Sequence, residues 1–145
     1  MVKNIFKLIT LFWILILSQS CFAQKENRTL IHSHNDYYQK TPFWKAYSCG
    51  LNSIEIDVFL ENDSLFVTHS KSEIMKNRDI ESLYLKPLQN ALELDYRNDL
   101  QLQLLVDIKS ETYSSLNQLT QILERYPKII YNQKIDIVIL SLIHI

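Results

Sequence analysis

The chain has 145 residues, of which 47% are hydrophobic and 21% are charged, and its formal net charge is −1. This length allows one ordinary domain. The nearly neutral charge gives no electrostatic reason to expect nucleic acid or an anionic membrane surface as a partner. A single glycine in the whole chain also excludes the glycine-rich loops that cradle phosphates through their backbone.

The first two dozen residues have the features of an export signal. An apolar run over residues 8–17 follows two lysines and is too short to span a bilayer, and small residues come next at Cys21 and Ala23. We predict a signal peptide over residues 1–23, cleaved after Ala23, and an exported protein, periplasmic or secreted, with no stable membrane span. The alternative is a lipoprotein anchored through an acylated Cys21. Removal of Cys21 would leave Cys49 as the only thiol, so no intramolecular disulfide is expected.

Strand-like and helix-like segments alternate along the rest of the chain. In chain order, the patterns predict a strand over 29–33, a helix over 41–49, strands over 53–59 and 65–68, a helix over 79–94, a strand over 102–108, a helix over 114–126 and a strand over 135–139. Thr41 would cap the first helix, with Pro42 at its first position, and Pro87 interrupts the second. Strands separated by helices favour parallel pairing, so the predicted fold class is α/β.

A (β/α)8 TIM-type barrel is the natural architecture for this alternation. Residues 24–139 correspond to the N-terminal half of such a barrel, because a complete one needs about 250 residues. We interpret residues 140–145 (LSLIHI) as a non-native end, because they match the translation of a transposase adapter used in sequencing libraries; a natural strand end is the alternative. Open sheet edges lead us to expect that this half barrel neither folds stably nor turns over substrate alone.

Ionisable residues lie at the carboxyl ends of the first four predicted strands, the rim where a (β/α) barrel builds its active site. Glu55 and Asp57 are two residues apart on one strand and project to the same side. The repulsion between two such carboxylates is tolerated when they bind Mg²⁺ or Ca²⁺ between them. The other rim residues are His32, His34, His69 and Asp107. Two histidines on opposite sides of a phosphate could deprotonate a nucleophile and protonate a leaving oxygen.

Three stretches carry a resemblance to a known superfamily. They are HSHNDY after the first strand, residues 42–70 (PFWKAYSCGLNSIEIDVFLENDSLFVTHS) and residues 102–111 (LQLLVDIKSE). Together they resemble the phospholipase C-like phosphodiesterases, whose best-known members are glycerophosphodiester phosphodiesterases. The resemblance implies a metal-dependent phosphoric diester hydrolase that acts on a small-molecule or lipid-derived phosphodiester.

The resemblance also implies roles for particular residues. The general acid and base would be His32 or His34 together with His69, and the metal ligands would be Glu55, Asp57 and Asp107. Lys109 would help bind phosphate. The sequence departs from the superfamily where His32-Ser33-His34 replaces the usual His-Arg-Gly, so the substrate does not carry over. Superfamily members often form a cyclic phosphate by attack of a substrate hydroxyl.

Two other functions remain open from the sequence. The spacing of His32 and His34 is also similar to the zinc motif of amidohydrolases and histidinol-phosphatase-like hydrolases. A non-catalytic exported barrel protein is the second alternative.

Residues beside these motifs have either a functional or a purely structural interpretation. Asn35, Asp36 and Tyr37 either bind substrate or a histidine, or simply form the turn after the first strand. Three further residues are expected in the interior: Trp44, Tyr47 and Cys49.

Overall fold

A computed structural model describes residues 30–97 and 99–141. The predicted signal peptide, Cys21 and His144 lie outside the described residues. The described part is a mixed α/β structure with one five-stranded sheet. The predicted α/β class is therefore confirmed.

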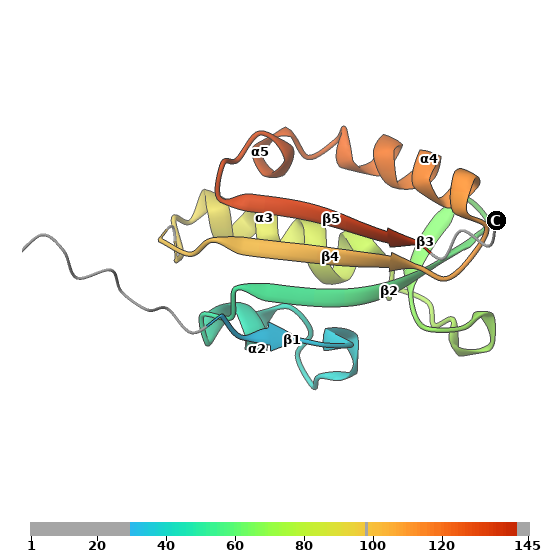
Figure 1. The fold of residues 1–145 in the computed structure, drawn as a ribbon, viewed down its shortest axis with the longest axis horizontal. Coiled ribbons are helices and arrows are strands. Elements are labelled where there is room, and N and C mark those ends of the chain that lie inside the picture. Colours follow the sequence, from blue (N-terminus) through green and yellow to red (C-terminus); the bar gives the residue numbers. More distant parts are fainter. Residues whose placement is uncertain (1–29, 98, 142–145) are drawn as a thin grey trace, which may run out of the picture.

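Four strands of the sheet run parallel, in the order β1 (His32–Ser33), β2 (Ser53–Glu61), β4 (Leu102–Ile108) and β5 (Ile135–Ser141) (Figure 1). Within residues 30–97 and 99–141, β5 forms one edge, and β1 and β3, which both pair with β2, form the other. This open sheet neither shows nor excludes a closed TIM barrel. Leu140 and Ser141 continue β5, and the Ser141 hydroxyl lies 2.8 Å from that of Thr112.

The remaining strand, β3 (Ser64–Val67), pairs antiparallel with β2, so it is not the parallel barrel strand that we predicted. The short connection between β2 and β3 explains why the two strands pair antiparallel. Glu61 pairs with Ser64, which leaves only Asn62 and Asp63 in the turn, with φ angles of 49° and 60°. A two-residue turn with positive φ at both positions makes a hairpin, whereas a parallel crossover needs a dozen residues or more. The chain after β3 therefore returns toward Asp57, whose carbonyl accepts a hydrogen bond from the Thr68 N–H.

The first predicted helix is shorter than expected. Helix α2 covers Trp44–Ser48, so Thr41 does not cap it and Pro42 is not its first residue. Phe43 precedes the helix with φ 62°, and its backbone N–H donates to the Asp36 carboxylate, which fixes the chain before a helical turn can begin. Two residues expected in the interior lie at the surface, because Trp44 is 40% exposed and Cys49 is exposed. Tyr47 is buried, as predicted.

The other helices begin and end close to their predicted positions. A π-helical turn, η4 (Glu81–Leu85), leads directly into α3 (Lys86–Glu93), and Pro87 lies at their junction, where the wider turn accommodates its ring. Helix α4 (Thr112–Leu123) begins before Ser114, because the Glu111 carboxylate caps the N–H groups of Tyr113 and Ser114. A short helix, α5 (Pro127–Ile130), and two 3-10 turns, η2 (Asp36–Tyr38) and η3 (Lys71–Glu73), complete the elements.

One face of the sheet packs on the helices and the other carries polar residues. Side chains alternate along β4, where Leu102, Leu104, Val106 and Ile108 are buried in a cluster with residues of α3, α4 and α5. Figure 1 shows α3 behind the strands, with α4 and α5 above them. Asp107 and Leu105 point to the opposite face and are half-buried. No helix among the described residues is long and apolar enough to cross a membrane.

Candidate active site

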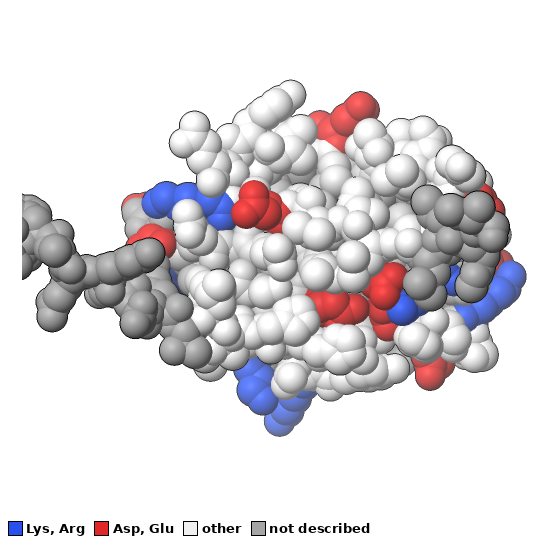
Figure 2. Space-filling model, viewed as in Figure 1, with Lys and Arg blue, Asp and Glu red and all other residues white. Residues whose placement is uncertain are grey.

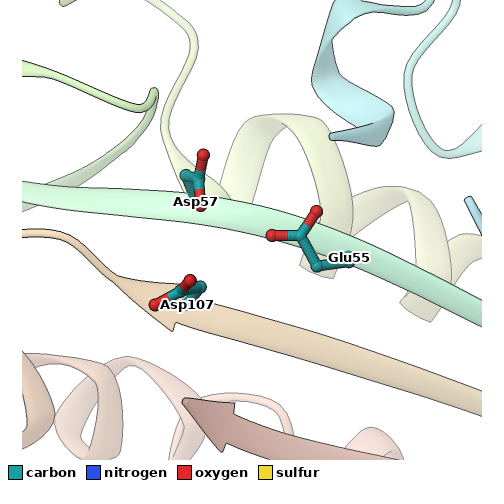
Figure 3. A group of neighbouring side chains, drawn as sticks. All are labelled: Glu55, Asp57 and Asp107. Carbon is teal, nitrogen blue, oxygen red and sulfur yellow. The ribbon is translucent and has the colours of Figure 1, made fainter. Parts of the chain in front are cut away.

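Three carboxylates converge on the polar face of the sheet. Glu55 and Asp57 project from β2, and Asp107 projects from β4, where it is the register partner of Asp57 (Figure 3). One oxygen from each side chain lies within 4.8 Å of the others. Glu55 and Asp57 are 4% and 2% exposed. The two-residue periodicity of a strand explains why the acids at positions 55 and 57 share a face.

The loop after β1 covers Glu55. His34 Nδ1 lies 3.0 Å from Glu55 Oε2, and the backbone N–H of Asn35 donates to the same oxygen at 2.6 Å. Asn35 adopts the left-handed conformation, φ 50° and ψ 46°, which asparagine tolerates better than most residues. The predicted site residue Asn35 therefore contacts the cluster through its backbone.

The β2–β3 hairpin returns the chain so that His69 lies beside Asp57. Its Nδ1 is 2.9 Å from Asp57 Oδ2, and the hydroxyl of the buried Tyr37 donates to that same oxygen at 2.7 Å. Burial alone would raise the pKa of Asp57, but the hydrogen bonds from Tyr37 and His69 and the charge of Lys109 hold that pKa below its ordinary value. The carboxylate is ionised and can only accept, so His69 Nδ1 carries the proton and Nε2 faces away from Asp57.

His32 has a different environment from the other two histidines. Its Nδ1 lies 2.8 Å from the hydroxyl of Ser53, its register partner on β2, and that hydroxyl donates to Gln103 Oε1 at 3.1 Å. The rings of His32 and His34 are 6.1 Å apart. His34 and His69 therefore each contact a buried carboxylate of the cluster, whereas His32 contacts a hydroxyl beside it.

Lys109 follows β4 and lies against the cluster. Its Nζ is 2.7 Å from Asp107 Oδ2 and 3.3 Å from Asp57 Oδ1. Burial alone would lower the pKa of Lys109, but the two carboxylates raise it above the ordinary value, so the side chain is a cation. The Lys109 and Asp107 side chains are 20% and 19% exposed, so this part of the site reaches the surface. Figure 2 shows acidic side chains with a basic one beside them on the face where β2 and β4 run in Figure 1.

The chain also matches a described domain family. The AIM6-like phosphodiesterase domain matches residues 22–101, more than half of the chain. The chain belongs to this family. The match confirms a phosphodiesterase-like domain and supports, at a coarse level, a phosphodiesterase-type hydrolase. It includes His34, Glu55, Asp57 and His69, and it ends before Asp107 and Lys109.

Sequence similarity to curated proteins points to the same family. The chain is 48% identical over 69 residues to an altered inheritance of mitochondria protein 6 homolog from Arthroderma benhamiae, over 43% of this chain and 22% of the relative. It is 37% identical over 67 residues to altered inheritance of mitochondria protein 6 from Eremothecium gossypii, over 45% of this chain and 17% of the relative. The protein of that name from Kluyveromyces lactis is 40% identical over 65 residues, 43% of this chain and 16% of the relative. The chain thus spans about a fifth of the length of these relatives. No solved structure gives a significant match.

In this AIM6-like domain a buried aspartate holds the loop after β1. Asp36 is 0% exposed and accepts hydrogen bonds from the Ser33 hydroxyl, the Phe43 N–H and the Tyr84 hydroxyl, at 2.8, 2.7 and 3.0 Å. Burial and the adjacent Asp36 carboxylate raise the pKa of Tyr84, so its hydroxyl remains a donor. Asp36 therefore organises the turn that presents His34 and Asn35. The sequence signal for this role was the Asn35-Asp36 pair, which is typical of turns.

Tyr37 belongs to the site itself, and its hydroxyl can be tested by a conservative change. Burial and the neighbouring Asp57 raise the pKa of Tyr37, so the hydroxyl is protonated at neutral pH. We expect Tyr37→Phe to lower the free energy of unfolding by about 1.5–3 kcal/mol, because a buried hydrogen bond to a charged group is lost. Urea denaturation of the complete polypeptide encoded at this locus measures the change. Tyr38→Phe is the matched control, because Tyr38 is 66% exposed and should change stability little. Equal effects of the two changes would contradict the role of Tyr37.

One cavity in the described part of the chain lies away from these residues. It has a volume of about 420 Å³ and its lining includes Tyr47, Tyr96, Leu100 and Ile135, near the amino-terminal ends of β4 and β5. The carboxylates lie instead on the polar face of the sheet, at Glu55 and Asp57 within β2 and at Asp107 near the carboxyl end of β4. We identify the site by its acids, bases and cation ligands, because the volume of a cavity does not show whether such groups are present.

Proposed function

We propose that the complete polypeptide is a metal-dependent phosphoric diester hydrolase in which His34 and His69 act as the general acid and base. The observation that supports this most directly is that each of these imidazoles turns Nδ1 toward a buried carboxylate of one cluster. The resemblance to phospholipase C-like phosphodiesterases, including glycerophosphodiester phosphodiesterases, is the narrower form of the proposal. Localisation outside the cytoplasm is part of the proposal and rests on the residues before position 24.

The residues present fit a hard divalent cation such as Mg²⁺ or Ca²⁺. Glu55, Asp57 and Asp107 offer only oxygen atoms, within 4.8 Å of one another, and these cations prefer oxygen ligands. When bound, the cation would neutralise charge on the phosphoryl group. The zinc alternative, through His32 and His34, has less support, because the group of possible metal ligands found among the described residues contains only carboxylates and no histidine.

The two histidines can divide the proton transfers between them. The adjacent carboxylate keeps the proton on Nδ1 of each ring, so Nε2 is the nitrogen that holds or releases a proton toward the substrate. One ring accepts the proton of the attacking hydroxyl group while the oxygen of that group bonds to phosphorus. The other donates a proton to the leaving oxygen as its bond to phosphorus breaks. Lys109 lies close enough to the acids to contact the phosphate of a bound diester, a small-molecule or lipid-derived one.

Metal dependence is the decisive test of this proposal. The complete polypeptide, expressed without residues 1–23, should hydrolyse members of a phosphodiester panel, lose the activity in EDTA, and regain it with Mg²⁺ or Ca²⁺. Hydrolysis that survives exhaustive chelation would overturn the cation role. Stoichiometric zinc with hydrolysis of amides and not of phosphodiesters would favour the amidohydrolase alternative, and inactivity on every substrate would favour the non-catalytic one.

A matched variant controls for indirect effects in this assay. Glu61 lies on β2 like Glu55 but forms an ion pair with Lys71 at 2.8 Å, outside the cluster. Glu61→Gln should therefore leave the Mg²⁺ and Ca²⁺ dependence unchanged. A shift as large as that caused by a change at Glu55 would show that the strand as a whole, and not the cluster, governs cation binding.

A further inference from the structure

The ammonium group of Lys109 shares its partners with the cation site. It contacts Asp107 Oδ2 at 2.7 Å and Asp57 Oδ1 at 3.3 Å, and both carboxylates belong to the set of three oxygen donors. Asp57 uses its other oxygen, Oδ2, for Tyr37 and His69. The oxygen of Asp57 that faces Lys109 is therefore the one left for a cation.

A metal ion and the ammonium group compete for these carboxylates. An ammonium group has three N–H donors and no lone pair, so it competes with a metal for carboxylate oxygens and cannot become a ligand itself. Two cations held within a few ångströms of each other also repel strongly where solvent screening is weak, and Asp57 is 2% exposed. The binding of one cation therefore weakens the contacts of the other.

The lysine is able to leave. The Lys109 side chain is 20% exposed, whereas that of Asp57 is 3% exposed, so the lysine has a route to solvent and the carboxylate does not. Lysine carries its charge on a flexible four-carbon stem. The Lys109 backbone stays in place through the hydrogen bond of its N–H to the Val58 carbonyl, at 2.9 Å.

We propose that Lys109 is a built-in counter-cation, which a divalent metal ion displaces from Asp57 and Asp107 and thereby releases toward the substrate phosphate. This inference rests on the proposed cation site. By formal charge, three carboxylates and one ammonium group sum to −2, and replacing the ammonium group with a divalent ion brings the sum at the carboxylates to −1. A monovalent ion has no charge advantage over the ammonium group that it would replace. Lys109 therefore makes the site selective for divalent ions and imposes an order, with the metal before the substrate.

Amine labelling of the complete polypeptide tests the displacement directly. Acetic anhydride, followed by peptide mass spectrometry, gives the acetylation rate of each lysine with and without Ca²⁺ or Mg²⁺. We expect the rate at Lys109 to rise by about tenfold or more when the cation binds, because the ammonium group leaves its carboxylate partners. Lys71 is the matched control, because it is paired with Glu61 away from the cluster and should react equally in both conditions. An unchanged or lower rate at Lys109 in a protein that binds Ca²⁺ would overturn the inference.

The affinity for the cation gives a second and independent measurement. Lys109→Met removes the competitor and keeps most of the side-chain volume, so calorimetric titration with Ca²⁺ should show binding that is tighter by about tenfold. Lys71→Met should leave the affinity unchanged. Equal or weaker binding by Lys109→Met would contradict the displacement. A wild-type protein that binds neither Ca²⁺ nor Mg²⁺ would contradict the proposed cation site itself, and with it this inference.

Discussion

His69→Ala should lower kcat of the complete polypeptide for a phosphodiester by about 10²–10⁴-fold, the usual contribution of a general acid or base. The same loss is expected for His34→Ala, because both imidazoles are held through Nδ1 by a carboxylate of the cluster. Removing a cluster acid, as in Glu55→Ala, should abolish turnover by weakening cation binding. Steady-state kinetics at saturating Mg²⁺ or Ca²⁺ measures these losses.

His32→Ala provides the contrast within the same motif. His32 contacts the Ser53 hydroxyl and no carboxylate of the cluster, so kcat should stay within a few-fold of the wild-type value. The His69 and His34 side chains are 62% and 72% exposed, and their removal should therefore leave the melting temperature nearly unchanged. Near wild-type activity of His69→Ala, or a loss at His32 as large as that at His34, would show that the acid and base are assigned wrongly.

Asp36→Ala should destabilise the complete polypeptide by about 3 kcal/mol or more, although Asp36 contacts no member of the carboxylate cluster. The change leaves three donors without their acceptor, namely the Ser33 hydroxyl, the Phe43 N–H and the Tyr84 hydroxyl. Each buried donor without a partner costs about 1–3 kcal/mol. Urea denaturation followed by circular dichroism measures the free energy of unfolding.

Two further variants make the Asp36 result specific. Asp136→Ala changes an exposed aspartate on β5 and should alter stability by no more than about 0.5 kcal/mol. Tyr84→Phe removes only one of the three donors and should cost less than Asp36→Ala. If Asp36→Ala were as mild as Asp136→Ala, the loop after β1 would have to be held by contacts other than this carboxylate.

The acids of the site could be predicted from the sequence because strand periodicity is strict. Side chains two apart on a strand share a face, and Asp107 is brought beside Asp57 once the strands at 53–59 and 102–108 pair in parallel. The position of His69 was predicted near the same acids, but for the wrong reason, because the strand before it returns as a hairpin. Only the two-residue turn at Asn62 and Asp63 carried that information.

The sequence could not separate residues whose roles depend on tertiary contacts. His32 and His34 are equivalent in a linear motif, and register alone directs one to Ser53 and the other to Glu55. Asp36 looked like an ordinary turn residue, because burial of its carboxylate depends on Tyr84, which is 48 residues away. Trp44 and Cys49 were expected inside, but they lie at the two ends of the short helix α2 and are exposed.

The β2–β3 hairpin also has a consequence for how the site forms. His69 and Asp57 are 12 residues apart in the sequence, whereas Asp107 is brought to β2 from 50 residues away. Closing a longer loop costs more chain entropy, and contacts between distant segments slow folding. We therefore expect the histidine–aspartate pair to assemble early, within a local unit, and the third carboxylate to join only after the helices that precede β4 have docked. The His69–Asp57 pair is thus local in the chain, whereas Asp107, and with it the complete set of cation ligands, is added only by the global fold.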